Sequence, residues 1–140
     1  MRLVALSFFI PLLIGTGGNV GSQTVTLIVR AMALDELSLR DVAWIAFKEF
    51  RVGLLLGAVM ALVAFARAQL LGVGIDVGLV VATTILAICL WSATVAAILP
   101  LTLRRLRIDP AVVSAPLITT LVDGTGLVIY FTIARILLHL

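Results

Sequence analysis

The chain has 140 residues, of which 63% are hydrophobic and only 12% are charged, with a formal net charge of +3. Its mean hydropathy of +1.30 lies far above the range of soluble globular domains and excludes a soluble fold. We therefore expect an integral membrane protein.

Four apolar segments follow one another along the chain, and each is long enough to cross the membrane. A spanning helix needs roughly 20 residues, and the first and third segments exceed that length without a single charged residue. The second is free of charge only over residues 52–66, so we expect its earlier charged residues to lie at the membrane edge or to reach towards it. The fourth is interrupted only by Asp123. The predicted spans are residues 3–29, 42–70, 77–103 and 111–134, and they predict one all-α, four-span transmembrane domain over residues 1–140 with no soluble domain.

The distribution of Lys and Arg between the loops predicts the orientation. Seven lie between spans one and two or between spans three and four: Arg30, Arg40, Lys48, Arg51, Arg104, Arg105 and Arg107. Three lie on the opposite side: Arg2, Arg67 and Arg135. Because short basic loops stay in the cytoplasm, we expect both termini to lie outside a cell (inner) membrane. The basic pI of about 10 then reflects topology and lipid headgroups, and no nucleic-acid partner is needed.

Local signals indicate where the helices begin. Ser38, followed three residues later by Asp41, resembles a capping box and predicts the start of the second spanning helix. Pro110 suits the first turn of the last helix. Pro11 and Pro116 predict bent or broken helices in spans one and four.

Two glycine pairs, Gly17 with Gly21 and Gly53 with Gly57, have the GxxxG spacing that lets helices approach closely. We favour packing within one subunit over a dimer contact for both pairs.

Spans one and four each carry a polar stripe. The stretch GTGGNVGSQT, residues 15–24, lacks the Lys and the preceding strand of a phosphate-binding loop. On a helix, however, Thr16, Asn19 and Gln23 of this stretch lie on one face, and Thr26 just beyond the stretch lies on the same face. In span four the corresponding face carries Thr119, Asp123, Gly126 and Tyr130. We interpret these residues as candidates to line a pore.

Asp123 is the central candidate for a binding site. An ionised Asp at the centre of a spanning helix costs about 2.5–3.5 kcal/mol on insertion scales, so water, a cation or another helix must compensate. One alternative is a protonated Asp that hydrogen-bonds to Thr119 or Asn19 for packing. Because no Lys or Arg lies in mid-span to pair with Asp123, we favour a diffusing cation. The oxygen ligands, without a His or Cys cluster, suit a hard ion such as Mg²⁺ or Ca²⁺. One carboxylate is too few for a pore wall, so we expect a homodimer with a pore at or near the subunit interface.

The motifs GTGGNVGSQT, IVRAMALDEL and LPLTLRRLRIDPAVVSAPLITTLVDGTGLVIY, in this order, resemble the membrane domain of the MgtE family of magnesium channels and transporters. The resemblance covers nearly the whole chain. It implies a homodimer with a central Mg²⁺ pathway and makes the four spans the second to fifth helices of that domain. It also implies that Asp123 binds Mg²⁺, that Thr119 offers its backbone carbonyl and that Asn19 approaches the same site.

Full-length members carry a cytoplasmic N-terminal domain, a CBS pair that senses Mg²⁺ and a further first helix. We find none of these in the 140 residues, so we interpret the chain as a fragment or a naturally short relative and make no claim that intracellular Mg²⁺ regulates it.

The expected function is Mg²⁺ transport along a channel-like pathway, with the membrane potential as the driving force and no enzymatic activity. The alternatives are an exchanger that couples a divalent cation to Na⁺ or H⁺, an intramembrane aspartyl protease, suggested by the sequence DGTG, and a structural membrane subunit whose polar stripes hold helices together.

Overall fold

The computed structural model describes residues 2–112 and 114–139, and all of the regular structure in these residues is helical. Four of the helices are long and apolar enough to cross a membrane, which confirms the all-α, four-span prediction. The elements are α1 (Arg2–Ser7), α2 (Ile10–Ala33), η1 (Leu39–Asp41), α3 (Val42–Leu70), α4 (Ile75–Arg105), η2 (Pro110–Val112) and α5 (Ala115–Leu138).

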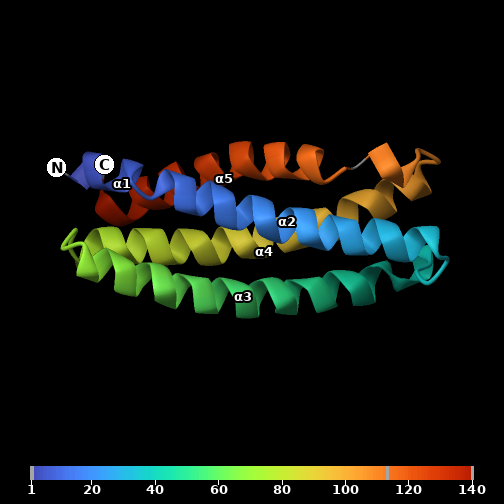
Figure 1. The fold of residues 1–140 in the computed structure, drawn as a ribbon, viewed down its shortest axis with the longest axis horizontal. Coiled ribbons are helices and arrows are strands. Elements are labelled where there is room, and N and C mark those ends of the chain that lie inside the picture. Colours follow the sequence, from blue (N-terminus) through green and yellow to red (C-terminus); the bar gives the residue numbers. More distant parts are fainter. Residues whose placement is uncertain (1, 113, 140) are drawn as a thin grey trace.

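The long helices lie side by side and alternate in direction (Figure 1). Both termini and the α3–α4 connection lie at one end of the bundle, which we call the terminal end. The connections 34–41 and 106–112 lie at the other, which we call the two-loop end. This arrangement groups the Lys and Arg residues as the sequence predicted, and the membrane side of each end stays a prediction.

The helix bounds differ from the predicted spans in an informative way. The range 42–70 is reproduced by α3, and α4 extends two residues beyond the predicted span at each end. The first span is broken at residues 8 and 9, between α1 and α2, and α2 continues to Ala33. The last helix begins at Ala115, four residues later than the expected start of the span.

Prolines explain the break in the first span and the late start of the last helix. Pro11 lies in the first turn of α2 and Pro116 in the first turn of α5, where the missing N–H group removes no hydrogen bond. A helix that began at residue 111 would place Pro116 in its interior, where the ring collides with the preceding turn. Pro110 instead opens the separate turn η2, so its predicted place in the first turn of the last helix is wrong.

The two-loop end is held together by the predicted capping box and by one arginine. Asp41 Oδ2 accepts hydrogen bonds from the backbone N–H and the hydroxyl of Ser38, at 2.9 and 2.7 Å. The guanidinium of Arg104, at the end of α4, donates to the carbonyl oxygen of Leu37 at 3.1 Å. Its other nitrogen lies 3.4 Å from Asp35 Oδ1. These bonds fix the α2–α3 connection against α4.

Helix α4 occupies the centre of the bundle, and half of its most hydrophobic 18-residue segment is buried. Helix α3 approaches α4 closely where Gly53 lies against the small residues Cys89 and Ala93. A Cβ atom added at Gly53 would lie only 3.0 Å from both Ala93 Cβ and the Cys89 carbonyl oxygen. Gly57 meets α4 in the same way. This glycine pair therefore packs within one chain, as the sequence predicted. The opposite side of α3 is left exposed.

Candidate functional site

A row of glycines on α2 lets α5 approach it closely at mid-bundle. A Cβ atom added at Gly18 would lie 2.9 Å from Thr119 Cγ2 and 3.3 Å from Asp123 Oδ1. A Cβ atom added at Gly21 would lie 2.7 Å from Ile118 Cγ2. All three distances are shorter than ordinary van der Waals contact, so a larger residue at either position would force these side chains or α5 itself to shift. Asp123 and Thr119 therefore face the backbone of α2 directly.

The carboxyl group of Asp123 is incompletely satisfied. The residue as a whole is half-buried, but its Oδ1 atom is inaccessible to solvent and has no hydrogen-bond donor in the described part of the chain. A buried acceptor without a donor is costly, and a cation, a water molecule or a proton can each satisfy such an oxygen. The alternative of a carboxyl group that bonds to Thr119 or Asn19 finds no support in the hydrogen bonds of the described residues.

The threonine hydroxyls of the two stripes present oxygen lone pairs only. Their Oγ1 atoms donate to the carbonyl oxygen four residues earlier at 2.7, 2.7 and 2.9 Å for Thr16, Thr26 and Thr119. Because the single hydroxyl hydrogen is used in this bond, the oxygen can only accept from any further partner. Such oxygens suit a hard cation or its bound waters.

The polar stripe of α2 emerges on the surface of the bundle. Asn19, Gln23 and Thr26 are all exposed, and Asn19 directly follows the glycine that faces Asp123. Towards the two-loop end, Gln23 and Thr26 line an open cavity of about 510 Å³ between α2 and the start of α5, together with Ser22, Leu27 and Ala115. An exposed polar strip therefore runs from this cavity to the level of the carboxylate.

The remaining pore-lining candidates lie in the interior of the chain. Gly126 is buried, with its backbone in contact with Ile88 of α4. Tyr130 is fully buried, and its hydroxyl donates to the carbonyl oxygen of Leu6 at 2.8 Å. Thr16 is buried as well. The structure thus places Asp123 and Thr119 against Gly18, the residue before Asn19. It leaves Gln23 and Thr26 on the surface. It places Thr16, Gly126 and Tyr130 in the core.

Two residues of the site had not been singled out from the sequence. Gly18 forms the surface against which Asp123 rests, and Ser92 of α4 donates a buried hydrogen bond of 2.6 Å to the carbonyl oxygen of Gly17. The double glycine at 17–18 was a signal for close approach. A single serine in an apolar span was a signal for a bond between helices.

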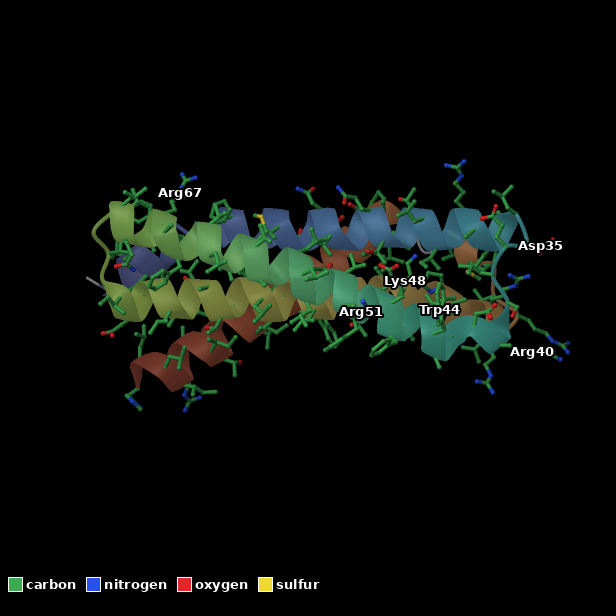
Figure 2. All side chains as sticks on the ribbon, turned by 90° about the horizontal axis from the view of Figure 1, so that it is seen from below. Asp35, Arg40, Trp44, Lys48, Arg51 and Arg67 are labelled. Carbon is green, nitrogen blue, oxygen red and sulfur yellow. The ribbon has the colours of Figure 1, made fainter. Side chains whose placement is uncertain are left out.

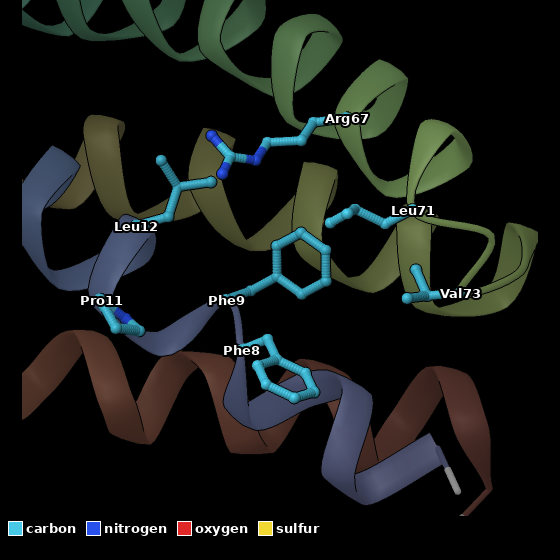
Figure 3. A pocket seen from close by; sticks show the side chains of 7 residues that line it. All are labelled: Phe8, Phe9, Pro11, Leu12, Arg67, Leu71 and Val73. Atoms are coloured by element: carbon cyan, nitrogen blue, oxygen red, sulfur yellow. The ribbon is translucent and has the colours of Figure 1, made fainter.

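A second pocket, of about 490 Å³, opens at the terminal end beside the break between α1 and α2 (Figure 3). Its lining is apolar apart from Arg67, whose side chain extends from α3 towards Leu12, and it holds no carboxylate. No group of three or more His, Cys, Asp or Glu side chains converges anywhere in the described residues.

Four spanning helices, a central carboxylate with an unsatisfied oxygen and an exposed polar strip beside it define a multi-pass membrane protein with a polar site between two of its spans. Residues 10–133 match the family model described as "MgtE: Divalent cation transporter". The chain belongs to the MgtE family, and the resemblance noted in its motifs is confirmed.

Curated relatives agree with this assignment. The magnesium transporter MgtE of Thermus thermophilus is 45% identical over 137 residues, and the match covers 98% of this chain and 30% of that protein. The magnesium transporter MgtE of Bacillus subtilis is 35% identical over 138 residues, covering 99% of this chain and 31% of that protein. The corresponding protein of Enterococcus faecalis is 32% identical over 134 residues. The chain thus spans about a third of the length of these relatives.

Proposed function

We propose that this chain forms a pathway for divalent cations, with Mg²⁺ as the transported ion and Asp123 as its ligand within the membrane. The observation that carries the proposal is the buried Oδ1 atom of Asp123, which has no donor among the described residues and faces the backbone of α2. The family and the names of the relatives support the choice of a divalent cation. The pathway conducts ions and performs no chemistry.

The ligands suit a cation that keeps most of its water. Mg²⁺ loses its water reluctantly and is usually bound through one or two carboxylates with several waters retained. Asp123 supplies the charge, while Thr119 and Asn19 accept hydrogen bonds from the waters. Gln23 and Thr26 continue the pathway towards the two-loop end, where the open cavity provides an entrance.

A second copy of the chain completes the pathway in this proposal. Asn19, Gln23 and Thr26 are exposed on a helix long enough to span the membrane, where contact with lipid tails would be unfavourable. A two-fold axis beside α2 and α5 would cover both strips and bring two copies of Asp123 to one aqueous passage. The proposed assembly is a homodimer in the cell membrane with its two-loop end in the cytoplasm.

The membrane potential supplies the driving force. Moving one elementary charge through 100 mV is worth about 2.3 kcal/mol, so a divalent cation gains about 4.6 kcal/mol on entry. This gain drives uptake without a second ion. Coupled exchange with Na⁺ or H⁺ differs in one measurable respect, because it needs an opposing gradient of that ion.

The experiment that tests the proposal is Mg²⁺ flux into proteoliposomes that contain the 140-residue chain, with and without an imposed negative-inside potential. Potential-driven entry is expected, with loss of flux in Asp123→Asn. Glu36→Gln is the matched control, because it also removes one carboxylate but from an exposed connection. A parallel unfolding assay should show that Mg²⁺ stabilises the unmodified chain and Glu36→Gln but not Asp123→Asn.

Each contrary outcome has a distinct meaning. Flux and Mg²⁺ stabilisation that survive in Asp123→Asn would overturn the role of the carboxylate and favour a packing function. Flux that requires a Na⁺ or H⁺ gradient and ignores the potential would replace the channel with an exchanger. Absence of flux in the unmodified chain would overturn the claim that these four spans form a complete pathway.

A further inference from the structure

A ridge of basic and aromatic side chains runs along the outer face of α3 at the two-loop end. It consists of Arg40, Trp44, Phe47, Lys48 and Arg51, and we call it the basic ridge. Figure 2 labels all of these residues except Phe47. The spacing of 0, 4, 7, 8 and 11 residues places all five on one face of the helical segment. All five are exposed, and Trp44 and Phe47 each retain 63% of their accessible surface.

The two cations inside α3 reach back towards the two-loop end. Lys48 Nζ lies over the ring of Trp44, 5.8 Å from its centroid, and Arg51 Cζ lies over the ring of Phe47 at 5.9 Å. Each aromatic ring comes one helical turn before its cation. Side chains on a helix point towards its N-terminus, and for α3 that direction leads out of the membrane. Both charges are therefore displaced towards the level at which lipid headgroups begin.

The basic ridge has an excess of positive charge. Glu49, the acidic neighbour within α3, is buried beside the ridge and lies 3.6 Å from Lys48 Nζ. Arg51 forms no ion pair within the described part of the chain. Of the acids in the nearby connection, Asp35 lies beside Arg104, Asp41 accepts from Ser38, and Glu36 lines a groove with Lys48. Arg51 is left as an exposed cation that an external anion can pair with.

The surroundings of the basic ridge favour a lipid over a soluble partner. Arg51 directly precedes the charge-free stretch 52–66, so its charge lies at the edge of the hydrocarbon, where lipid headgroups are the nearest anions. Beyond it the same helix exposes apolar side chains, including Leu55 and Val59. Beside the ridge, a groove of about 550 Å³ between α2 and α3 is lined mainly by apolar residues, with the charged side chains of Arg30, Lys48, Glu36 and Glu49. An acyl chain and a headgroup each find a matching surface.

We propose that the basic ridge is a binding site for an anionic phospholipid in the leaflet at the two-loop end. The lipid phosphate lies between Lys48 and Arg51, the rings of Trp44 and Phe47 hold the two cations at headgroup level, and the acyl chains lie along the exposed apolar face of α3. Aromatic rings are enriched at this level of membrane proteins, and basic side chains there attract anionic lipids. A zwitterionic lipid brings its own cation and gains less from the ridge.

Native mass spectrometry of the detergent-purified chain tests this proposal without any cation flux. Phosphatidylglycerol and phosphatidylcholine with identical acyl chains are the two probes. The chain should bind phosphatidylglycerol more tightly, and Arg51→Gln should weaken that binding about fivefold, the factor expected for one cation near the surface. Arg105→Gln is the matched control, since it removes an exposed cation from the same end of the bundle but away from the ridge.

Lys48→Arg serves as a second variant, because Lys48→Gln would also leave buried Glu49 unpaired. It keeps the charge and should bind phosphatidylglycerol as the unmodified chain does. Equal binding of the two lipids, or equal weakening by Arg51→Gln and Arg105→Gln, would overturn the proposal in favour of general surface charge. Displacement of the lipid by a soluble oligoglutamate peptide would overturn it in favour of an acidic protein segment.

Discussion

Gly18→Ala tests the contact between α2 and the candidate site. The added methyl group would lie 2.9 Å from Thr119 Cγ2 and 3.3 Å from Asp123 Oδ1, whereas ordinary contact begins at 3.4 Å. Because both neighbours belong to α5, the substitution must push α5 away from α2 or rotate both side chains. Overpacking of this kind costs about 1–3 kcal/mol. The better helix propensity of Ala returns about 1 kcal/mol, so we expect a net loss of about 0–2 kcal/mol.

Gly15→Ala is the control on the same helix, because nothing lies within 4 Å of its added Cβ atom. It should raise the stability by about 0.5–1 kcal/mol through helix propensity alone. The assay is denaturant-induced unfolding in mild detergent, combined with Mg²⁺ flux in proteoliposomes. Gly18→Ala should fall below Gly15→Ala in stability by about 1–3 kcal/mol and should reduce flux, while Gly15→Ala should not. Equal stability and equal flux in the two variants would refute the close approach of α5 to Gly18.

Two further predictions concern hydrogen bonds away from the carboxylate. Ser92→Ala removes the buried hydrogen bond from α4 to a carbonyl oxygen of α2. It should lower the free energy of unfolding by about 0.6–1.7 kcal/mol, as found for hydrogen bonds between membrane helices. The same denaturant assay measures this loss. The hydrogen bond from the Ser38 hydroxyl, and to a lesser extent the one from the Ser38 backbone N–H, holds the pKa of Asp41 below its ordinary range. The capping box therefore contributes stability that is complete above about pH 4 and is lost as the pH falls through the lowered pKa. A titration of thermal stability between pH 6 and pH 3 should show this loss in the unmodified chain and less of it in Ser38→Ala.

Comparisons between variants separate the loss of these two hydrogen-bonding arrangements from general effects of the substitutions on stability. Thr94→Ala also removes a hydroxyl from α4, but that hydroxyl donates within its own helix at 2.7 Å, so its loss should cost less than that of Ser92. An identical cost would show that the bond to α2 contributes nothing specific. For the capping box, a pH profile of Ser38→Ala that matches the unmodified chain would mean that other carboxylates control acid unfolding.

The sequence predicted the four spanning helices because each apolar segment is long enough to cross a membrane. It also predicted the capping box at Ser38 and Asp41, since that motif depends on four consecutive residues. The start of the last helix was less certain. Pro110 and Pro116 both suit a first turn, and the choice between them depends on where the connection from α4 meets α2.

The candidate site shows where helical periodicity stops being informative. Thr119, Asp123, Gly126 and Tyr130 share one face of α5, as the spacing indicated. That face meets α2 at the level of Asp123, but it meets α4 at Gly126 and reaches α1 at Tyr130. Periodicity groups residues on a face and carries no information about the neighbour at each level. The contact between Gly18 and Asp123 likewise depends on the packing of whole helices.

The threonine hydroxyls of the two polar stripes bear on which sign of charge the proposed pathway would favour. Water bound to a cation turns its hydrogens outward, whereas water around an anion turns its oxygens outward. Thr26 and Thr119 have already given their hydrogens to the backbone of their own helices, so they can accept from the first kind of water and have nothing to donate to the second. In the proposed pathway, the backbone bonding of these two threonines would therefore favour the waters of a cation over those of an anion at these two positions, independently of the charge on Asp123.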